Sequence, residues 1–189
     1  MFATDALDMI EYTSGDATST TYGKERAAAG HSSPFPLTRM EVGNEERLMD
    51  PGDYPAHYKL ITTAIWSKHP KMTIIASGRW GPSIDGSPCL TGQRCDAWDD
   101  HFYRTPDQMG NMGHHYDSYN RSLPDVFVGE FAANIGHHMT LQAAVAEAVF
   151  MLGFESNGDK VRSSSFAPLL CNVNGTQWGY DLINFDSEY

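Results

Sequence analysis

Four acidic residues are expected at the C-terminal ends of strands that short apolar runs predict, where a carboxylate must be partly desolvated. They are Glu11 after "DMI", Glu45 after "EVGN", Asp100 before "HFY" and Glu130 after "FVG". A soluble core disfavours a carboxylate at such positions unless it has partners or a function. We therefore take these positions as candidates for chemistry.

Glu45 and Glu130 form the best candidate pair. Two carboxylates that face each other across a cleft are the minimum for glycoside hydrolysis, because one donates a proton to the leaving oxygen while the other attacks the sugar or activates water. Either acid alone is more often a structural acid. Asn44 directly precedes Glu45 in "GNEE" and adds a third polar group, which favours the catalytic interpretation. Glu46 follows the motif and is expected to point away from the site.

The elements that must position these residues alternate between strands and helices. Strands are expected at residues 7–12, 38–44, 72–78, 96–103, 126–132 and 163–174. One helix is expected between the "DPGDYP" turn and His69-Pro70, and a second over much of the stretch from Pro106 to Tyr119. A third is expected at residues 141–152, with one apolar stripe formed by Leu141, Val145, Ala148, Val149 and Leu152.

The alternation of strand and helix predicts parallel βα units, and the continuously apolar strands predict a sheet covered on both faces. In a parallel barrel the functional groups collect at the C-terminal ends of the strands, because the loops there surround one mouth. The sequence therefore predicts an α/β fold that presents Glu45 and Glu130 at the same end of its strands.

Length and charge limit the possible partners. The 189 residues suggest one domain or a piece of a larger barrel. The 13 Lys and Arg against 24 Asp and Glu give a net charge of -11, which repels nucleic acid and anionic membranes. No apolar run approaches the ~20 residues of a membrane helix, and residues 1–15 lack the features of a signal peptide. We expect a soluble chain that binds neither nucleic acid nor membrane.

Cysteines and glycosylation sequons bear on the compartment. Cys89 and Cys95 in "SPCLTGQRC" are spaced to close a small disulfide ring, while Cys171 in "FAPLLC" is expected to be a packed thiol. Sequons at Asn120 ("NRS") and Asn174 ("NGT") give weak support for a secreted parent protein, whose signal peptide would then lie upstream of Met1.

Two histidine pairs are candidates for metal binding by residue type. His114-His115 and His137-His138 lack metal-ligand spacing with a third ligand, so loop or surface positions are expected for them. We expect no metal and no cofactor.

The ordered motifs "ALDMIEYTSGD", "MEVGNEE", "DAWDDHFYRTP", "VFVGEFA" and "SSFAPLLCNVNGTQW" resemble the catalytic barrel of fungal and plant α-L-arabinofuranosidases of glycoside hydrolase family 51. The resemblance covers nearly the whole chain. A complete (β/α)8 barrel typically needs ~250 residues. The resemblance therefore implies a partial (β/α)8 TIM barrel over residues 1–189, approximately strands 3 to 8, without the N-terminal strands and the accessory β-sandwich.

The resemblance also implies roles for site residues. Glu45 would be the acid/base after barrel strand 4, and Glu130 the nucleophile that ends strand 7. Retention of configuration requires the two carboxyls to be about 5 to 5.5 Å apart. Asn44 would bind the 2-hydroxyl of the sugar, and Tyr103 would donate a hydrogen bond to Glu130.

Further positions are less sharply defined by the family pattern. Asn172 and Asn174, after the last strand, are expected to line the substrate pocket. His101 is either a neighbour that supports the catalytic acids or a packed histidine. The implied activity is release of terminal α-L-arabinofuranosyl groups from arabinoxylan or arabinan. An inert fragment, an endoglucanase or a xylosidase of the same clan are the alternatives, and exposed sheet edges would favour self-association.

Overall fold

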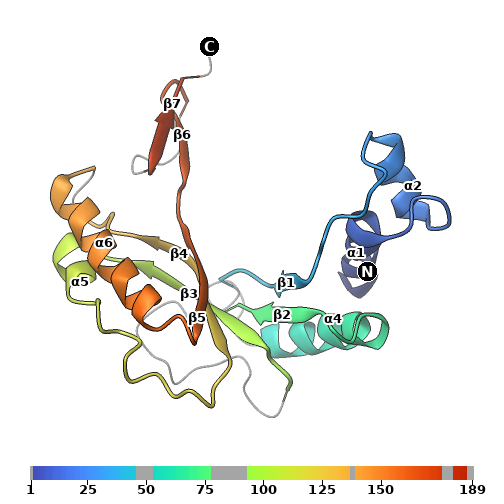
Figure 1. Cartoon of the computed structure of the whole chain (residues 1–189), viewed down its shortest axis with the longest axis horizontal. Helices are drawn as coiled ribbons and strands as arrows, with labels where there is room; N and C mark the ends of the chain where they lie inside the picture. Colours follow the sequence, from blue (N-terminus) through green and yellow to red (C-terminus); the bar gives the residue numbers. More distant parts are fainter. Residues whose placement is uncertain (1, 46–52, 78–92, 137–138, 176–180, 187–189) are drawn as a thin grey trace. The chain divides into compact units, whose positions relative to one another are not determined.

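The computed structural model describes residues 2–45, 53–77, 93–136, 139–175 and 181–186, and divides into two compact units (Figure 1). The described residues up to Ser77, together with residues 93–96, form the first unit. The second unit comprises the described residues from Ala97 onward.

The first unit contains two parallel strands joined by a helix. Its helices are α1 (Phe2–Ser14), α2 (Thr21–Ala28) and α4 (Tyr54–Lys68), and its strands are β1 (Arg39–Val42) and β2 (Thr73–Ala76). The strands pair from Arg39 opposite Thr73 to Val42 opposite Ala76. Their core includes Ile10, Val42, Tyr58, Ile65 and Ile74. This confirms the predicted β1–α4–β2 unit.

The strand predicted at residues 7–12 is wrong, because these residues lie inside helix α1. A short apolar run cannot be assigned to a strand or a helix from periodicity alone. In the structure only Ile10 of this helix is buried, and its carbonyl accepts hydrogen bonds from the hydroxyls of Thr13 and Ser14. Glu11 is therefore a helix residue and not a carboxylate at a strand end, and it accepts a hydrogen bond from the Tyr22 amide at 3.0 Å.

The cysteine prediction is met at the two cysteines that the structure describes. Cys95 is disulfide-bonded, and it packs against the core of the first unit. Cys171 is a free thiol in the second unit, 7% exposed. Cys89, the predicted partner of Cys95, lies outside the described residues.

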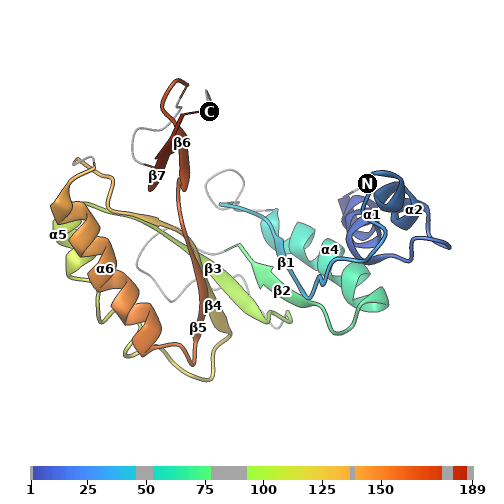
Figure 2. The same ribbon diagram turned by 45° about the horizontal axis from the view of Figure 1, so that its top comes forward.

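The second unit is a parallel three-stranded sheet with two helices on one face. The strands β3 (Ala97–Tyr103), β4 (Asp125–Ala132) and β5 (Val161–Phe166) are hydrogen-bonded in that order. Helices α5 (Pro106–Gly110) and α6 (Leu141–Ser156) pack against each other beside this sheet (Figures 1 and 2). A separate pair of short parallel strands, β6 (Leu170–Asn172) and β7 (Ile183–Phe185), follows β5.

Aromatic rings fill the layer between the helices and the sheet. Phe102 on β3 and Phe131 on β4 both make edge contacts with Phe150 of α6, with ring centroids 5.1 and 6.1 Å apart. Phe131 also contacts Phe154 at 5.4 Å. Such rings bury large apolar areas and gain from edge-to-face geometry. This layer determines which side of β3 faces the helices.

Helix α6 buries a different face from the predicted one. Its buried residues are Ala143, Ala146, Phe150, Gly153 and Phe154. The predicted stripe is largely exposed: Leu141 is 81%, Val145 55% and Leu152 62% exposed. Because almost every position of this helix is apolar, periodicity cannot select the buried face, and the two phenylalanines do so instead.

Two other element predictions are only partly correct. The predicted helix between Pro106 and Tyr119 is confirmed for α5 alone, and hydrogen-bonded turns follow it from Asn111 onward. The predicted last strand at residues 163–174 is two strands, β5 and β6, which belong to different sheets. The remaining predicted strands, at β1, β2, β3 and β4, are confirmed.

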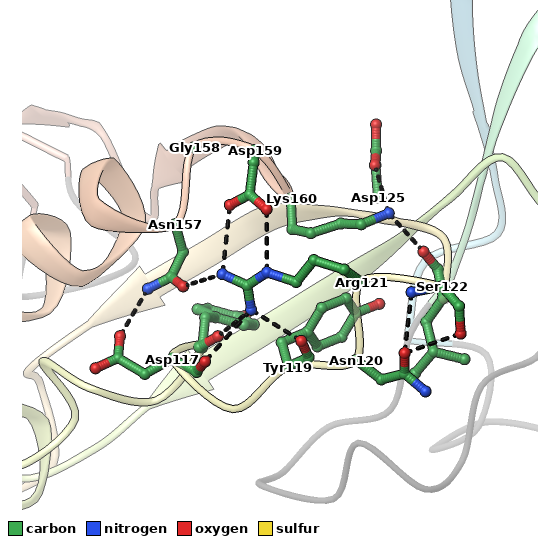
Figure 3. Close-up of polar contacts among 12 residues, drawn as sticks. Asp117, Tyr119, Asn120, Arg121, Ser122, Asp125, Asn157, Gly158, Asp159 and Lys160 are labelled. Carbon is green, nitrogen blue, oxygen red and sulfur yellow. Dashed lines mark hydrogen bonds and ion pairs between the residues drawn. The ribbon is translucent and has the colours of Figure 1, made fainter.

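The loops at the N-terminal ends of β4 and β5 are joined by Arg121 (Figure 3). Its guanidinium donates to Asp159 at 3.0 and 3.3 Å and to Asn157 Oδ1 at 2.6 Å. It also donates to the carbonyls of Tyr116 and Tyr119. This arginine fixes the end of the sheet that is remote from the C-terminal ends of the strands.

Candidate active site

The first unit places Asn44 and Glu45 in a turn directly after β1. Gly43 has φ 98°, a left-handed conformation that glycine adopts without steric cost. Glu45 also has a positive φ, 51°, which is uncommon for a residue with a side chain. Strained backbone of this kind is found at functional sites, where the surrounding structure has to impose it.

Tyr54 supports the strand from which this turn leaves. Its buried hydroxyl donates to the Val42 carbonyl at 2.7 Å and accepts from the Ser77 amide at 2.7 Å. Val42 ends β1 and Ser77 directly follows β2, so one side chain from α4 joins the C-terminal ends of both strands. The path of the chain into the Asn44–Glu45 turn is thereby held in place.

The second unit places Glu130 near the C-terminal end of β4, where two side chains from β3 meet it. The Tyr103 hydroxyl donates to Glu130 Oε2 at 2.5 Å. His101 Nδ1 faces the same oxygen at 3.4 Å. The Glu130 side chain is 29% exposed, while that of His101 is 6% exposed. The predicted contact between Tyr103 and Glu130 is present, and His101 is a neighbour of this carboxylate.

The His101 ring is held from its other side by Asp99. His101 Nε2 lies 2.5 Å from Asp99 Oδ2, and Asp99 is 2% exposed. Because an ionised carboxylate can only accept, the proton of this bond is assigned to Nε2. Asp99, His101 and Tyr103 alternate along β3 and therefore share one face of the sheet.

Asp100 lies in the middle of β3, and its side chain is directed to the helix layer instead. Its carboxyl accepts a hydrogen bond from the buried Tyr116 hydroxyl at 3.1 Å. Burial raises the pKa of Asp100 to about 7, although the Tyr116 bond opposes that shift. The prediction that Asp100 lies at a strand end is wrong, because it is the fourth residue of β3, which runs from Ala97 to Tyr103. Asp99 was not predicted as a site residue, and its only signal in the sequence is the alternation of positions 99, 101 and 103.

The two asparagines predicted to line the substrate pocket form hydrogen bonds in the region of β6 and β7. Asn172 Oδ1 accepts from the Asn174 amide at 3.0 Å. The Asn174 side chain donates to Asp186 Oδ1 at 2.7 Å. A role for both in binding substrate stays a prediction.

The histidine pairs have different outcomes. His114 is exposed and pairs with Asp117 at 2.8 Å, while His115 packs its ring on Phe102 at 5.2 Å. These are the surface and packing roles expected of turn residues. Glu46 and the pair at 137–138 lie outside the described residues.

Asn44 and Glu45 belong to the first unit, and Tyr103 and Glu130 to the second. The separation of the Glu45 and Glu130 carboxyls therefore stays a prediction, as does the assignment of all six site residues. What the geometry provides is a carboxylate held at one oxygen by a phenol, and a strained turn that carries a second carboxylate.

Two family models match the sequence. Residues 1–121 match the α-L-arabinofuranosidase 1 domain, and residues 114–187 match the α-L-arabinofuranosidase C-terminal domain. Among curated relatives, an extracellular exo-α-L-arabinofuranosidase of Streptomyces chartreusis is 38% identical over 97% of this chain and 22% of its own length. A probable α-L-arabinofuranosidase A of Aspergillus terreus is 40% identical over 96% of this chain and 28% of its own length. The chain thus spans about a quarter of the length of these relatives.

Solved structures give the same answer. An arabinose-bound α-L-arabinofuranosidase, MgGH51, matches 99% of this chain and 31% of its own, with TM-score 0.86 and 31% identity. An α-L-arabinofuranosidase from Thermotoga maritima in complex with arabinose matches 89% of this chain and 41% of its own, at TM-score 0.68 and 18% identity, and shows the fold alone. The predicted α/β fold of a partial (β/α)8 barrel is confirmed. The chain belongs to the α-L-arabinofuranosidases of glycoside hydrolase family 51.

Proposed function

We propose that this chain carries the catalytic carboxylates of a retaining glycoside hydrolase that releases terminal non-reducing α-L-arabinofuranosyl residues from arabinose-containing polysaccharides. Membership of the family supports the substrate class. The observation that carries the proposal is the hydrogen bond that orients Glu130, in which the Tyr103 hydroxyl donates to Oε2 at 2.5 Å. A nucleophile needs a carboxylate kept in one orientation, and this hydrogen bond provides it.

The same contacts suggest which oxygen attacks. Both Tyr103 and His101 meet Glu130 at Oε2. Oε1 is then the oxygen directed at the anomeric carbon. Attack by Oε1 forms the glycosyl-enzyme bond as the bond to the leaving oxygen breaks. The Tyr103 hydroxyl stays on Oε2 throughout and keeps the carboxyl group from rotating.

Glu45 supplies the proton in this proposal. As general acid it protonates the departing oxygen, and as general base it later takes a proton from the water that cleaves the glycosyl-enzyme. Asn44, its neighbour in the strained turn after β1, binds the 2-hydroxyl of the sugar. A hydrogen bond to that hydroxyl strengthens as oxocarbenium character develops in the transition state.

Hydrolysis of an aryl α-L-arabinofuranoside by the purified chain tests the activity. Glu130→Ala should abolish turnover, and azide should restore it by taking the place of the missing nucleophile. The restored product should be an arabinofuranosyl azide, identified by mass spectrometry. Glu130→Ala with full activity would refute the assignment.

Glu45→Ala tests the acid/base role separately. Substrates with poor leaving groups should be slowed far more than activated ones, because help from a general acid matters only when the departing oxygen is basic. An equal loss for all leaving groups would contradict this role. A carboxyl separation nearer to about 9 Å would indicate inversion and refute the retaining mechanism.

The remaining predictions concern the wider context. An extracellular site of action is supported by the name of the Streptomyces relative and by the exposed sequon residue Asn120. No helix in the described part of the chain has the length and apolar character to cross a membrane.

We retain the proposal that residues 1–189 form one catalytic barrel portion and that sheet edges favour self-association. If the unmutated chain shows no turnover, the inert-fragment interpretation is favoured. Preference for aryl xylosides or glucosides would favour the alternative specificities.

A further inference from the structure

Asp99 is a buried carboxylate. Among the residues that the structure describes, its hydrogen-bond partners lie beside Glu130, the proposed nucleophile. Asp99 is 2% exposed, and its two oxygens bind the Gly129 amide at 2.7 Å and the His101 ring at 2.5 Å. A buried carboxylate is costly unless hydrogen bonds compensate for the loss of water. Both of its partners are immediate neighbours of Glu130, one in sequence and one in space.

The contact with Gly129 arises from an irregularity in β4. Asp99 lies opposite Phe127, whereas His101 lies opposite Glu130, so β4 holds one extra residue over this stretch. Such a bulge removes an amide from the regular ladder and turns the adjoining side chains. Asp99 Oδ1 accepts the Gly129 amide at this point. A Cβ at residue 129 would overlap the Asp99 carboxylate, which explains why a glycine is needed there.

The contact with His101 determines how that ring faces Glu130. Asp99 Oδ2 takes the Nε2 edge, and the opposite Nδ1 edge then lies 3.4 Å from Glu130 Oε2. Removal of the Asp99 carboxylate takes this acceptor from Nε2–H, and water has little access to a ring that is 5% exposed. One carboxylate therefore fixes the backbone directly before Glu130 and the side chain that flanks it.

We propose that Asp99 is a positioning residue for the nucleophile: through the bulge amide of Gly129 and the Nε2 edge of His101, it holds Glu130 in its reactive orientation. This inference rests on the proposed function for the role of Glu130. It makes no use of Asp99 as an acid or base, and Asp99 does not touch substrate. Its contribution is to the placement of a group that does.

The first test reads the ring of His101 directly. Proton and nitrogen NMR of the chain labelled at histidine nitrogens will show the protonation of each ring nitrogen, and His101→Gln identifies the relevant signals among the eight histidines. In the unmutated chain Nε2 should carry a proton with a strongly downfield shift, as expected of a short bond to a carboxylate. Asp99→Asn should remove that downfield signal. Retention of the signal in Asp99→Asn would overturn the proposal.

The second test reads turnover. Asp99→Asn should lower kcat by at least about tenfold and displace the pH profile of kcat, while KM changes by less than about twofold, because ground-state binding is untouched. Asp100→Asn is the matched control, since it lies next to Asp99 on β3 but faces Tyr116. It should leave kcat within about twofold. Equal kcat and pH profiles for Asp99→Asn and the unmutated chain would overturn the proposal even with the proposed function intact.

Gly129→Ala provides an independent route to the same result. The added methyl group should displace the Asp99 carboxylate without changing its charge, and should therefore alter the His101 signals as Asp99→Asn does. Native His101 signals in Gly129→Ala would contradict the proposal. If the unmutated chain has no turnover on any aryl glycoside, the proposed function fails, but the NMR comparison of the two variants still decides whether Asp99 positions His101. Circular dichroism and melting curves verify that each variant is folded.

Discussion

The carboxylates at the two ends of β4 have different surroundings. At the N-terminal end, Asp125 is paired with Lys160 at 3.2 Å and with Arg162 at 2.9 Å. At the C-terminal end, Glu130 meets a phenol and an imidazole from β3. The first carboxylate is neutralised by cations on β5 and its preceding loop, whereas the second is oriented by groups that leave one of its oxygens unengaged with the residues described.

This difference indicates that Asp125 stabilises the fold, whereas Glu130, at the other end of the same strand, is available for chemistry. Burial raises the pKa of Asp125, but the hydrogen bonds and charges of Arg162 and Lys160 outweigh it and hold the pKa below its usual range. A carboxylate matched to two cations is a poor nucleophile and a useful anchor. The pairs of Asp125 with Lys160 and Arg162 therefore lie at the end of β4 remote from the proposed site, as expected of a parallel barrel.

The largest effect should come from the hydroxyl at the C-terminal end. Tyr103→Phe keeps the ring but removes the hydrogen bond to Glu130 Oε2. We expect kcat on an aryl arabinofuranoside to fall by about 10- to 100-fold, equivalent to about 1.4 to 2.7 kcal/mol in the barrier. The melting temperature should change little, since Tyr103 is partly exposed. A large stability loss with unchanged kcat would reverse the contrast between the two ends.

A smaller effect, of the opposite kind, is expected from Arg121 near the N-terminal end. Arg121→Ala leaves the carbonyls of Tyr116 and Tyr119 without this donor and breaks the bond to Asn157. The free energy of unfolding should fall by about 1 to 2 kcal/mol, measured by denaturant titration. Arg162→Ala, which loses its contacts with Asp125 and the Gly158 carbonyl and its charge interaction with Asp159, is the control and should cost less. Neither variant should alter kcat, and a loss of kcat in Arg121→Ala would link the two ends.

Asp100 is a second carboxylate with a tyrosine partner, and its burial should make the stability of the protein depend on pH. Like Glu130 it binds a phenol, but burial raises its pKa to about 7 from 3.8. Between these values the folded state binds the proton more tightly than the unfolded state, so stability falls as the pH rises. Asp100→Asn cannot ionise and should reduce this fall, on the order of 1 kcal/mol between pH 5 and 7. A stability difference that does not vary with pH in melts of the two proteins would disprove the ionisation argument.

The smallest effect is expected at Asp125. Its lowered pKa adds stability above the unfolded value of 3.8, and this is lost as the pH falls through the folded value. Because the pairs are partly exposed, Asp125→Asn should cost a few tenths of a kcal/mol at pH 7 and less at pH 2. Melts at both pH values check this. A larger loss at pH 2 than at pH 7 would have the wrong sign.

Strands β1 to β4 could be predicted from sequence because each contains apolar residues in a short run that is bounded by turns. Helix α1 could not, since "LDMIEY" is compatible with either element until its packing is known. The buried face of α6 could not be predicted either, because it depends on the contacts of Phe150 and Phe154 with Phe131 of strand β4.

The site shows the same limit. Glu130 and Tyr103 were identifiable from their motifs, and their contact is present. Asp99 and Asp100 are adjacent and chemically identical, so composition could not tell them apart. Only the aromatic layer, which takes the Phe102 side of β3 against α6, decides that Asp99 faces His101 and that Asp100 faces Tyr116.

The Tyr54 hydroxyl also makes one backbone proton informative about motion. The Ser77 amide donates to it at 2.7 Å, and the same hydroxyl binds the last carbonyl of β1. The amide also donates to the Val42 carbonyl at 3.4 Å. Deuterium from the solvent can replace the Ser77 amide proton only when the amide leaves both acceptors, and that event also releases the strand that leads to Glu45. The exchange time of this single amide, followed by NMR in heavy water, therefore measures how often the proposed acid/base loses its support. Tyr54→Phe should shorten that time, because the amide then keeps the longer bond to the Val42 carbonyl but loses the shorter one to the hydroxyl.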